Sequence, residues 1–273
     1  MKQSRRIEIA KDTLDILEKG YYINNQGERV DITFIQKNAV DNTRLYKPDE
    51  LEELCSNSKK ENNFQTRFEV INETTLDAVR RLTGEGALDV LCLNFASAKN
   101  PGGGFLGGAL AQEECIARAT GLYPCLLQSK EYYEYHRKQS TCLYSDHMIY
   151  SPQVPILKTE GGDMLDEVVC TTIITSPAVN AGVVRRNEAV NVDKIIPVMR
   201  KRIEKLLTLC LKQQHKTLVL GAWGCGVFQN DPEEIAELFR EAFTGNFANQ
   251  FEKVVFAVKT NKESIIEPFM KRF

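Results

Sequence analysis

Two adjacent glutamates, Glu113 and Glu114, follow closely on a cluster of glycines that begins with Gly102, Gly103 and Gly104. Backbone without Cβ atoms can approach a ligand closely, and its N–H groups can hold phosphate oxygens. A pair of carboxyl groups beside such a phosphate is suited to acid and base catalysis on a glycosidic bond. These residues therefore predict an enzyme that cuts a bond to a phosphate-linked sugar.

Two less specific interpretations compete with this one. A glycine cluster after a strand is most often only a mobile loop, and the Gly102-x-Gly104-x-x-Gly107 spacing also fits the dinucleotide fingerprint. The context disfavours a dehydrogenase, because about five residues separate the strand end near Ala96 from Gly102, and Leu122 to Lys130 stands where that fold requires an acidic residue. In the same way, the run from Gln112 to Glu114 fits an acidic first turn stabilised by the helix dipole.

A second glycine-rich stretch follows a short apolar strand at Thr217 to Leu220. It leads through Asp231, a good N-cap, into a helix that begins at Pro232. Glycines before a helix N-terminus can cradle a diphosphate with backbone N–H groups, or can simply form a tight turn. The residues of this second loop that we expect at the ligand are Gly224, Cys225, Gly226, Val227 and Phe228.

The first motif resembles a family signature. The three glycines, seven spacer residues and then Gln112, Glu113 and Glu114 resemble the GGG-x(6–8)-QEE signature of poly(ADP-ribose) glycohydrolases. The flanking sequence NFASAKNPGGG and the later GAWGCGVFQNDP are similar to the microbial-type branch of that family. The resemblance covers roughly residues 67–273 and implies a macrodomain-like core.

The resemblance also implies roles for individual residues. Glu114 would be the catalytic acid and base, and Glu113 would hold the ribose hydroxyls. We expect Glu114 to lie in a partly dry pocket, where a carboxyl group keeps its proton long enough to protonate the leaving oxygen. The same group, once ionised, would activate the water that captures the ribosyl centre. Asn94 and Asn100 are the expected partners of ribose hydroxyls, and Phe228 would stack on adenine or the adjacent ribose.

The elements that must position these residues alternate between strand and helix. We expect strands at residues 67–72, 88–95, 148–152, 167–175, 217–220 and 254–258, with the short strand at 148–152 ended by Pro152. This order predicts an α/β fold, a mixed sheet sandwiched between helices, with both glycine loops at the edge where strands end. The sequence divides into an N-terminal accessory region, residues 1–66, and a catalytic domain, residues 67–273.

The accessory region has its own predicted elements. Residues 1–20 form an amphipathic helix with Gly20 as its C-cap, and residues 21–36 alternate around a turn at Asn25 to Gly27, which suggests a hairpin. A short acidic helix begins near Pro48, and residues 56–63 are polar enough for an exposed loop. No functional motif stands out in this region.

Composition limits the partners. The formal charge of −2 predicts no direct grip on nucleic acid, and the absence of a long apolar run predicts no membrane partner. The eight cysteines are scattered and the three histidines do not pair at ligand spacing, so we expect reduced thiols, a cytoplasmic location, no metal and no cofactor. For a eukaryotic source, a nuclear location is the alternative.

The expected substrate is poly(ADP-ribose), and the expected product is ADP-ribose. Two alternatives stay open from the sequence. One is a hydrolase for ADP-ribose attached to a protein side chain or a nucleic acid, and the other is a non-catalytic ADP-ribose-binding macrodomain. The intact pair of Glu113 and Glu114 argues against the second alternative.

Overall fold

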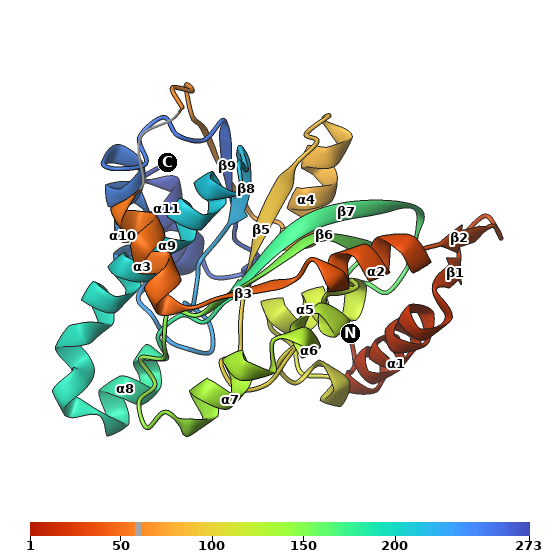
Figure 1. Ribbon diagram of the computed structural model, residues 1–273, viewed down its shortest axis with the longest axis horizontal. Coiled ribbons are helices and arrows are strands. Elements are labelled where there is room, and N and C mark those ends of the chain that lie inside the picture. The colour runs from red at the N-terminus through yellow and green to blue at the C-terminus, as the bar shows by residue number, and fades with distance from the viewer. Residues whose placement is uncertain (58–61) are drawn as a thin grey trace.

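Figure 1 shows a computed structural model of the protein, which describes residues 1–57 and 62–273. A seven-stranded mixed sheet with the order β3-β6-β7-β5-β8-β9-β4 runs through the molecule, and helices lie on both of its faces. The predicted α/β sandwich is therefore confirmed.

The central sheet consists of β3 (Arg44–Tyr46), β4 (Arg67–Ile71), β5 (Val90–Phe95), β6 (Met148–Lys158), β7 (Met164–Ser176), β8 (Thr217–Leu220) and β9 (Lys253–Ala257). A separate hairpin consists of β1 (Tyr21–Ile23) and β2 (Arg29–Asp31). The α-helices are α1 (Gln3–Lys19), α2 (Thr33–Asp41), α3 (Pro48–Ser56), α4 (Thr75–Gly84), α5 (Gln112–Ala119), α6 (Leu122–Gln128), α7 (Lys130–Lys138), α8 (Ala181–Asn187), α9 (Ile195–Lys212), α10 (Pro232–Thr244) and α11 (Glu263–Met270). Short 3-10 turns lie at η1 (Phe105–Gly107) and η2 (Ala189–Lys194).

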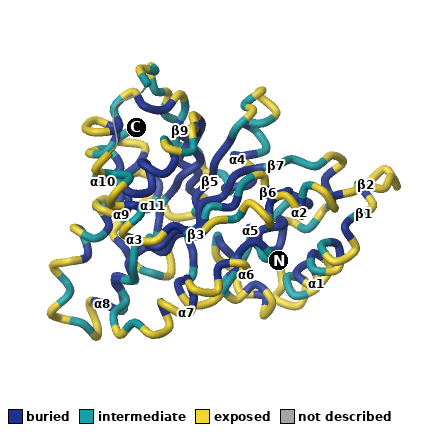
Figure 2. Tube along the Cα trace, viewed as in Figure 1, coloured by how far each residue is buried: buried dark blue, intermediate teal, exposed yellow. Residues whose placement is uncertain are grey.

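The alternation of side chains along β5 explains why both faces of the sheet are covered. Leu91 and Leu93 point into an apolar core shared with α9, α10 and α11. Val90 and Cys92 point into a second core shared with α4, α5 and α6. Because successive side chains of a strand face opposite sides, a strand with apolar residues on both faces requires cover on both. Figure 2 shows the resulting band of buried strands between the two layers.

The two glycine loops leave from neighbouring strands. β5 pairs in parallel with β8, with Val90 opposite Thr217, and also in parallel with β7. β9 continues the parallel arrangement between β8 and β4. The carboxyl ends of these strands therefore meet at one edge of the sheet, which is where such sheets bind ligands.

One strand prediction was wrong in its extent. β6 does not end at Pro152 but continues to Lys158, and it pairs with β7 as a long antiparallel hairpin. Pro152 lies in a register shift between Ser151 and Val154, and Gln153 has a φ of 51°. A proline is tolerated at such a bulge because no ladder hydrogen bond is required of it there.

The N-terminal region matches its prediction in part. α1 ends at Gly20, which has a φ of 77°, and β1 and β2 form the expected hairpin. The alternation does not continue to residue 36, because α2 begins at Thr33, whose N–H group donates to Asp31. Of the predicted loop at residues 56–63, residues 58–61 lie outside the described residues, and Ser56 ends α3.

The region also contributes to the central sheet. β3 forms its edge by pairing antiparallel with β6, and α3 packs against α9. The division of the chain at residue 66 stays a prediction.

Among the helices of the described residues, none is both long and apolar enough to cross a membrane.

Candidate active site

A pocket of about 720 Å³ opens at the carboxyl edge of the sheet. Its size lies within the range of small-molecule sites. Both glycine loops contribute to its lining, and so do the segments that follow β4, β7 and β9. The sequence-predicted residues that line it are Asn100, Gly103, Gly104, Gln112, Glu113, Glu114, Gly224, Cys225, Gly226, Val227 and Phe228.

Glu113 is the more deeply buried of the two glutamates. Only 3% of Glu113 is exposed, while Glu114 is half-buried. The Glu113 carboxylate accepts a hydrogen bond from the Ser97 N–H group at 2.6 Å and one from the Asn94 amide at 3.5 Å. Asn94 in turn donates to the Thr175 hydroxyl at 3.1 Å, across the β5–β7 pair. The carboxylate of Glu113 is thus fixed by backbone and side chain together.

Burial dominates the electrostatics of Glu113. Loss of water, with a further contribution from the neighbouring Glu114, raises its pKa to about 8, although the hydrogen bonds from Ser97 and Asn94 oppose the shift. Burial disfavours the charged form of a carboxyl group, which is the direction seen here. Burial therefore favours the neutral, protonated form of Glu113 over the charged form.

Glu114 is held by the first glycine loop. Its Oε1 atom accepts a hydrogen bond from the Gly104 N–H group at 2.9 Å. A Cβ atom on Gly103 would lie 2.9 Å from the carboxyl carbon of Glu114 and 3.1 Å from Oε2 of Glu113. Gly103 also has a φ of +60°, a conformation that residues with side chains rarely adopt. Both glutamates therefore occupy space that only glycine leaves free.

This geometry predicts the effect of a single methyl group. Gly103→Ala should displace the Glu114 carboxylate and lower kcat/KM by about 10- to 100-fold, as small misplacements of catalytic groups do. Gly107→Ala is the matched control, because a Cβ atom on Gly107 meets nothing within 4 Å. Steady-state rates of the two folded variants make the comparison. Equal activity of both would show that the close approach at Gly103 is not important.

Gln112 connects α5 to the sheet. Its amide nitrogen donates to the Leu93 carbonyl at 2.7 Å and to the Thr75 hydroxyl at 3.1 Å. Its amide oxygen accepts from the Phe95 N–H group at 2.8 Å. Gln112 thus fixes the start of the helix that carries both glutamates.

Two predicted residues, Asn94 and Gly102, lie behind the pocket lining rather than in it. Asn94 is fully buried and contacts Glu113 as described above. A Cβ atom on Gly102 would lie 2.9 Å from the ring of Phe105, so this glycine lets the loop fold onto that ring. In the structure, both residues support the groups that line the pocket.

The second loop presents free N–H groups. Among the hydrogen bonds of the described residues, none is donated by the backbone N–H groups of Gly224, Gly226, Val227 or Phe228. In the first loop, by contrast, the N–H groups of Gly103 and Gly104 are already used, by the Asn100 carbonyl and by Glu114. Unpaired N–H groups in a glycine-rich turn form an anion-binding concavity. Of the two loops, the second therefore has more N–H groups free to bind an anion.

Asn230 and Ala178 shape this second loop. Gly224 has a φ of 76°, and a Cβ atom there would lie 2.5 Å from the side chains of both residues. Asn230 is 4% exposed and donates to the carbonyls of Val179 and Gly224. Cys225 is half-buried, and burial raises the pKa of its thiol well above the usual range.

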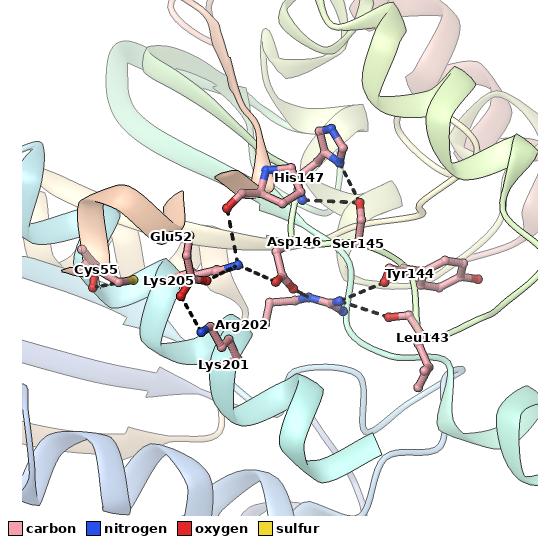
Figure 3. Close-up of polar contacts among 12 residues, drawn as sticks. Glu52, Cys55, Leu143, Tyr144, Ser145, Asp146, His147, Lys201, Arg202 and Lys205 are labelled. Atoms are coloured by element: carbon pink, nitrogen blue, oxygen red, sulfur yellow. Dashed lines mark hydrogen bonds and ion pairs between the residues drawn. The ribbon is translucent and has the colours of Figure 1, made fainter. Parts of the chain in front are cut away.

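A buried ion pair supports the segment that packs against Phe228. The Tyr144 ring lies 6.0 Å from the Phe228 ring. Figure 3 shows Arg202 of α9 reaching the Leu143 and Tyr144 carbonyls and the Asp146 carboxylate, which is 2.9 Å from its Nε atom. Lys205 contacts the other oxygen of Asp146 at 2.8 Å. Residues 143–146 are thus anchored to α9 by two cations.

Sequence reasoning missed several lining residues. They are Glu73, Thr74, Thr75, Phe95, Ser97, Leu110, Ala111, Cys115, Glu160, Ala178, Ala222, Ala257, Val258, Lys259, Thr260 and Ile265. Those after β4 and β9 follow predicted strands, so the rule that strand carboxyl ends meet at one edge would have found them. Glu160, whose pKa is raised by burial, comes from the β6–β7 turn.

No metal site accompanies the pocket in the part of the chain that the structure describes. Within residues 1–57 and 62–273, no three His, Cys, Asp or Glu side chains lie close enough together to hold an ion.

Comparisons with known proteins agree with this geometry. Residues 10–159 match the family model described as microbial-type PARG, catalytic domain. The structure of poly(ADP-ribose) glycohydrolase from Thermomonospora curvata bound to the inhibitor ADP-HPD is 44% identical, with a TM-score of 0.92, covering 99% of this chain and 100% of that one. The enzyme from Deinococcus radiodurans in complex with ADP-ribose is 43% identical, with a TM-score of 0.83, covering 87% of this chain and 96% of that one. No curated protein sequence matches the chain.

The similarity extends further than the sequence motifs suggested. We expected it to cover residues 67–273, but the family match begins at residue 10, and the Thermomonospora curvata structure aligns with nearly the whole chain. The macrodomain-like fold is confirmed by the same alignments. By sequence and by structure, the chain belongs to the microbial-type poly(ADP-ribose) glycohydrolase family.

Proposed function

We propose that this protein hydrolyses the ribose–ribose O-glycosidic bonds of poly(ADP-ribose) and releases ADP-ribose. The observation that carries the proposal is the pocket itself, where Glu113 and Glu114 line the same cavity as the unpaired N–H groups of the second glycine loop. Carboxyl groups suit the cleavage of a glycosidic bond, and free N–H groups suit a diphosphate. A substrate that contains both features fits the whole pocket.

The binding role belongs mainly to the second loop. The N–H groups of Gly224, Gly226 and Val227 would hold the diphosphate, and the half-buried ring of Phe228 would stack on adenine or on the adjacent ribose. Asn100, Gly103 and Gly104 of the first loop line the same pocket. This arrangement directs the distal ribose toward the two glutamates.

Glu114 would carry the proton transfers. Its carboxyl group would donate a proton to the leaving ribose oxygen as the C1–O bond breaks, and positive charge would develop on the ring. The resulting carboxylate would then take a proton from water while the water oxygen bonds to C1. The proton lost in the first step is thus recovered in the second.

Glu113 would orient the substrate. Its carboxyl group is fixed by Ser97 and Asn94, so its position does not depend on the ligand. From there it would hydrogen-bond the ribose hydroxyls and keep C1 in line with Glu114. A rigid positioning group of this kind lowers the entropy cost of reaching the transition state.

The substrate class is tested with defined substrates. We expect wild-type protein to release ADP-ribose from purified poly(ADP-ribose) and to act much more slowly on a peptide that carries a single ADP-ribose. Product quantification by chromatography on both substrates measures the ratio. Faster release from the single unit would instead assign a mono-ADP-ribosyl hydrolase, and binding without release from either substrate would assign a non-catalytic reader.

Two further parts of the assignment are also proposals. We place the reaction in the cytoplasm, a setting supported by the eight cysteines, all of which are free. We also propose that residues 1–66 act as an accessory region for the catalytic domain at residues 67–273.

A further inference from the structure

Helix α1 lies directly against the loop that holds Glu114. Gln3 and Ala10 of α1 contact the 3-10 turn η1, the helix also contacts α5, and Figure 1 shows α1 beside α5. The carboxyl end of the helix packs elsewhere, next to the β1–β2 hairpin. The first turns of α1 are thus the part of the N-terminal region that meets the active-site loop.

Side chains hold three consecutive carbonyl groups of this loop. The Gln3 amide donates to the Gly107 carbonyl at 2.8 Å, and Arg6 Nε donates to the Gly108 carbonyl at 2.6 Å. Arg118 of α5 donates to the next carbonyl, that of Ala109, at 2.7 Å. Two of the three donors therefore come from α1.

Apolar packing brings the helix equally close. Phe105, at the start of η1, is 1% exposed and packs with Ala10 of α1 and Ala117 of α5. Gly108 has a φ of +73°, and a Cβ atom on it would lie 2.8 Å from the Gln3 carbonyl. The absence of a side chain at Gly108 is what allows α1 to reach the loop.

A buried lysine contacts the middle of α1. Lys158, at the end of β6, is fully buried, and its Nζ atom lies 2.7 Å from Asp12 Oδ2 and 2.8 Å from the Thr13 hydroxyl. The Thr13 hydroxyl also donates to the Arg118 carbonyl at 2.5 Å. Because burial of an amine is costly unless it is paired, this contact fixes α1 against both β6 and α5.

The contacts continue through the loop to Glu114. The Gly104 carbonyl accepts the N–H groups of Gly107 at 3.0 Å and Ala109 at 3.2 Å. The N–H group of the same Gly104 donates to Glu114. A displacement of Gly107 and Gly108 would therefore move the group that fixes the Glu114 carboxylate.

We propose that α1 is a positioning element for Glu114, with Arg6 and Gln3 as positioning residues that act through the loop from Gly103 to Ala109. The expected effect on catalysis rests on the proposed function, whereas the role of α1 in holding the loop does not. It gives the N-terminal region a specific task, which is to hold the active-site loop in its productive geometry.

The test compares Arg6→Ala with Arg5→Ala. Arg5 is the adjacent residue on α1, and its guanidinium pairs with Glu8 where both side chains are well exposed. We expect Arg6→Ala to lower kcat for ADP-ribose release by about 10-fold or more, with KM changed less than about threefold, because the loop misplaces the catalytic group. Arg6→Lys, which restores one donor, should recover part of the loss.

Amide hydrogen exchange supplies a readout that does not depend on activity. The N–H groups of Gly103, Phe105, Gly107, Gly108 and Ala109 are hydrogen-bonded within the loop, so a loosened loop exchanges faster. We expect faster exchange in this peptide for Arg6→Ala and wild-type exchange for Arg5→Ala, with a melting temperature lowered by less than about 4 °C.

The rate and exchange measurements together decide whether α1 positions Glu114. Wild-type kcat and wild-type exchange in Arg6→Ala would overturn the proposal, and so would a loss of kcat without faster exchange in the loop. If wild-type protein releases no ADP-ribose at all, the proposed function fails. In that case the exchange comparison still shows whether α1 holds the loop.

Discussion

Glu114→Gln should reduce the release of ADP-ribose from poly(ADP-ribose) by about 10²- to 10⁴-fold, the range typical of a lost general acid and base. An amide cannot donate a proton to the leaving oxygen or take one from water. Its oxygen can still accept the hydrogen bond from the Gly104 N–H group, so the loop and the fold should be preserved. The measurement is single-turnover product release at equal concentrations of folded protein.

The control distinguishes catalysis from helix stabilisation. Glu233 lies in the first turn of α10, as Glu114 lies in the first turn of α5, but it is not part of the pocket lining. Glu233→Gln should therefore leave the rate near the wild-type value. Calorimetry should show that Glu114→Gln still binds ADP-ribose. An equal loss of rate in Glu114→Gln and Glu233→Gln would show that Glu114 only stabilises its helix.

Arg202→Met should lower the free energy of unfolding by about 3–5 kcal/mol, the cost typical of removing one partner of a buried ion pair. Arg202 is fully buried and donates to Asp146 and to the carbonyls of Leu143 and Pro177. Methionine fills most of the space but provides no donor, so the carbonyls of Leu143 and Pro177 lose this donor and Asp146 keeps only its contact with Lys205. Urea unfolding followed by circular dichroism measures the change.

Lys201→Met is the matched control for this prediction. Lys201 is the preceding residue of α9, and its ion pair with Glu52 at 2.6 Å is exposed on both sides, so its loss should cost less than about 1 kcal/mol. A similar cost for both variants would show that the burial of Arg202 contributes nothing.

The pH dependence gives a second check on the same ion pair. Burial alone would raise the pKa of Asp146, but the charges and hydrogen bonds of Arg202 and Lys205 hold it below its usual value. Stability from a lowered carboxyl pKa is present above the unfolded value, about 4, and is lost as the pH falls through the folded value. Arg202→Met should therefore lose less stability than wild type as the pH falls below about 4.

The sequence predicted the parts of the site that depend on local pattern. The glycine cluster at Gly102 to Gly104 and the acidic start of α5 needed no tertiary information, because glycine content and helix N-termini are local properties. The position of both loops at one sheet edge followed from alternating strands and helices. All these elements were confirmed in the structure.

What depends on register between distant strands was not predictable. Asn94 contacts Thr175 because β5 and β7 align those two positions, and no periodicity in either strand specifies that alignment. Glu160 reaches the pocket because β6 continues past Pro152, which the sequence marked as a stop. The sequence also did not predict which elements α1 packs against, because an amphipathic pattern shows that one face of a helix is buried but does not identify the packing partner.

The order of strands has a consequence for synthesis of the chain on the ribosome. β4 pairs only with β9 within the described sheet, so residues 67–71 have no partner strand until residues 253–257 have been synthesised. The pocket is also lined by Thr260 and Ile265, beyond β9. Because synthesis proceeds from the N-terminus, no shorter nascent chain can complete the sheet or the pocket. The ligand site therefore assembles only after the residues from β9 to Ile265 have emerged.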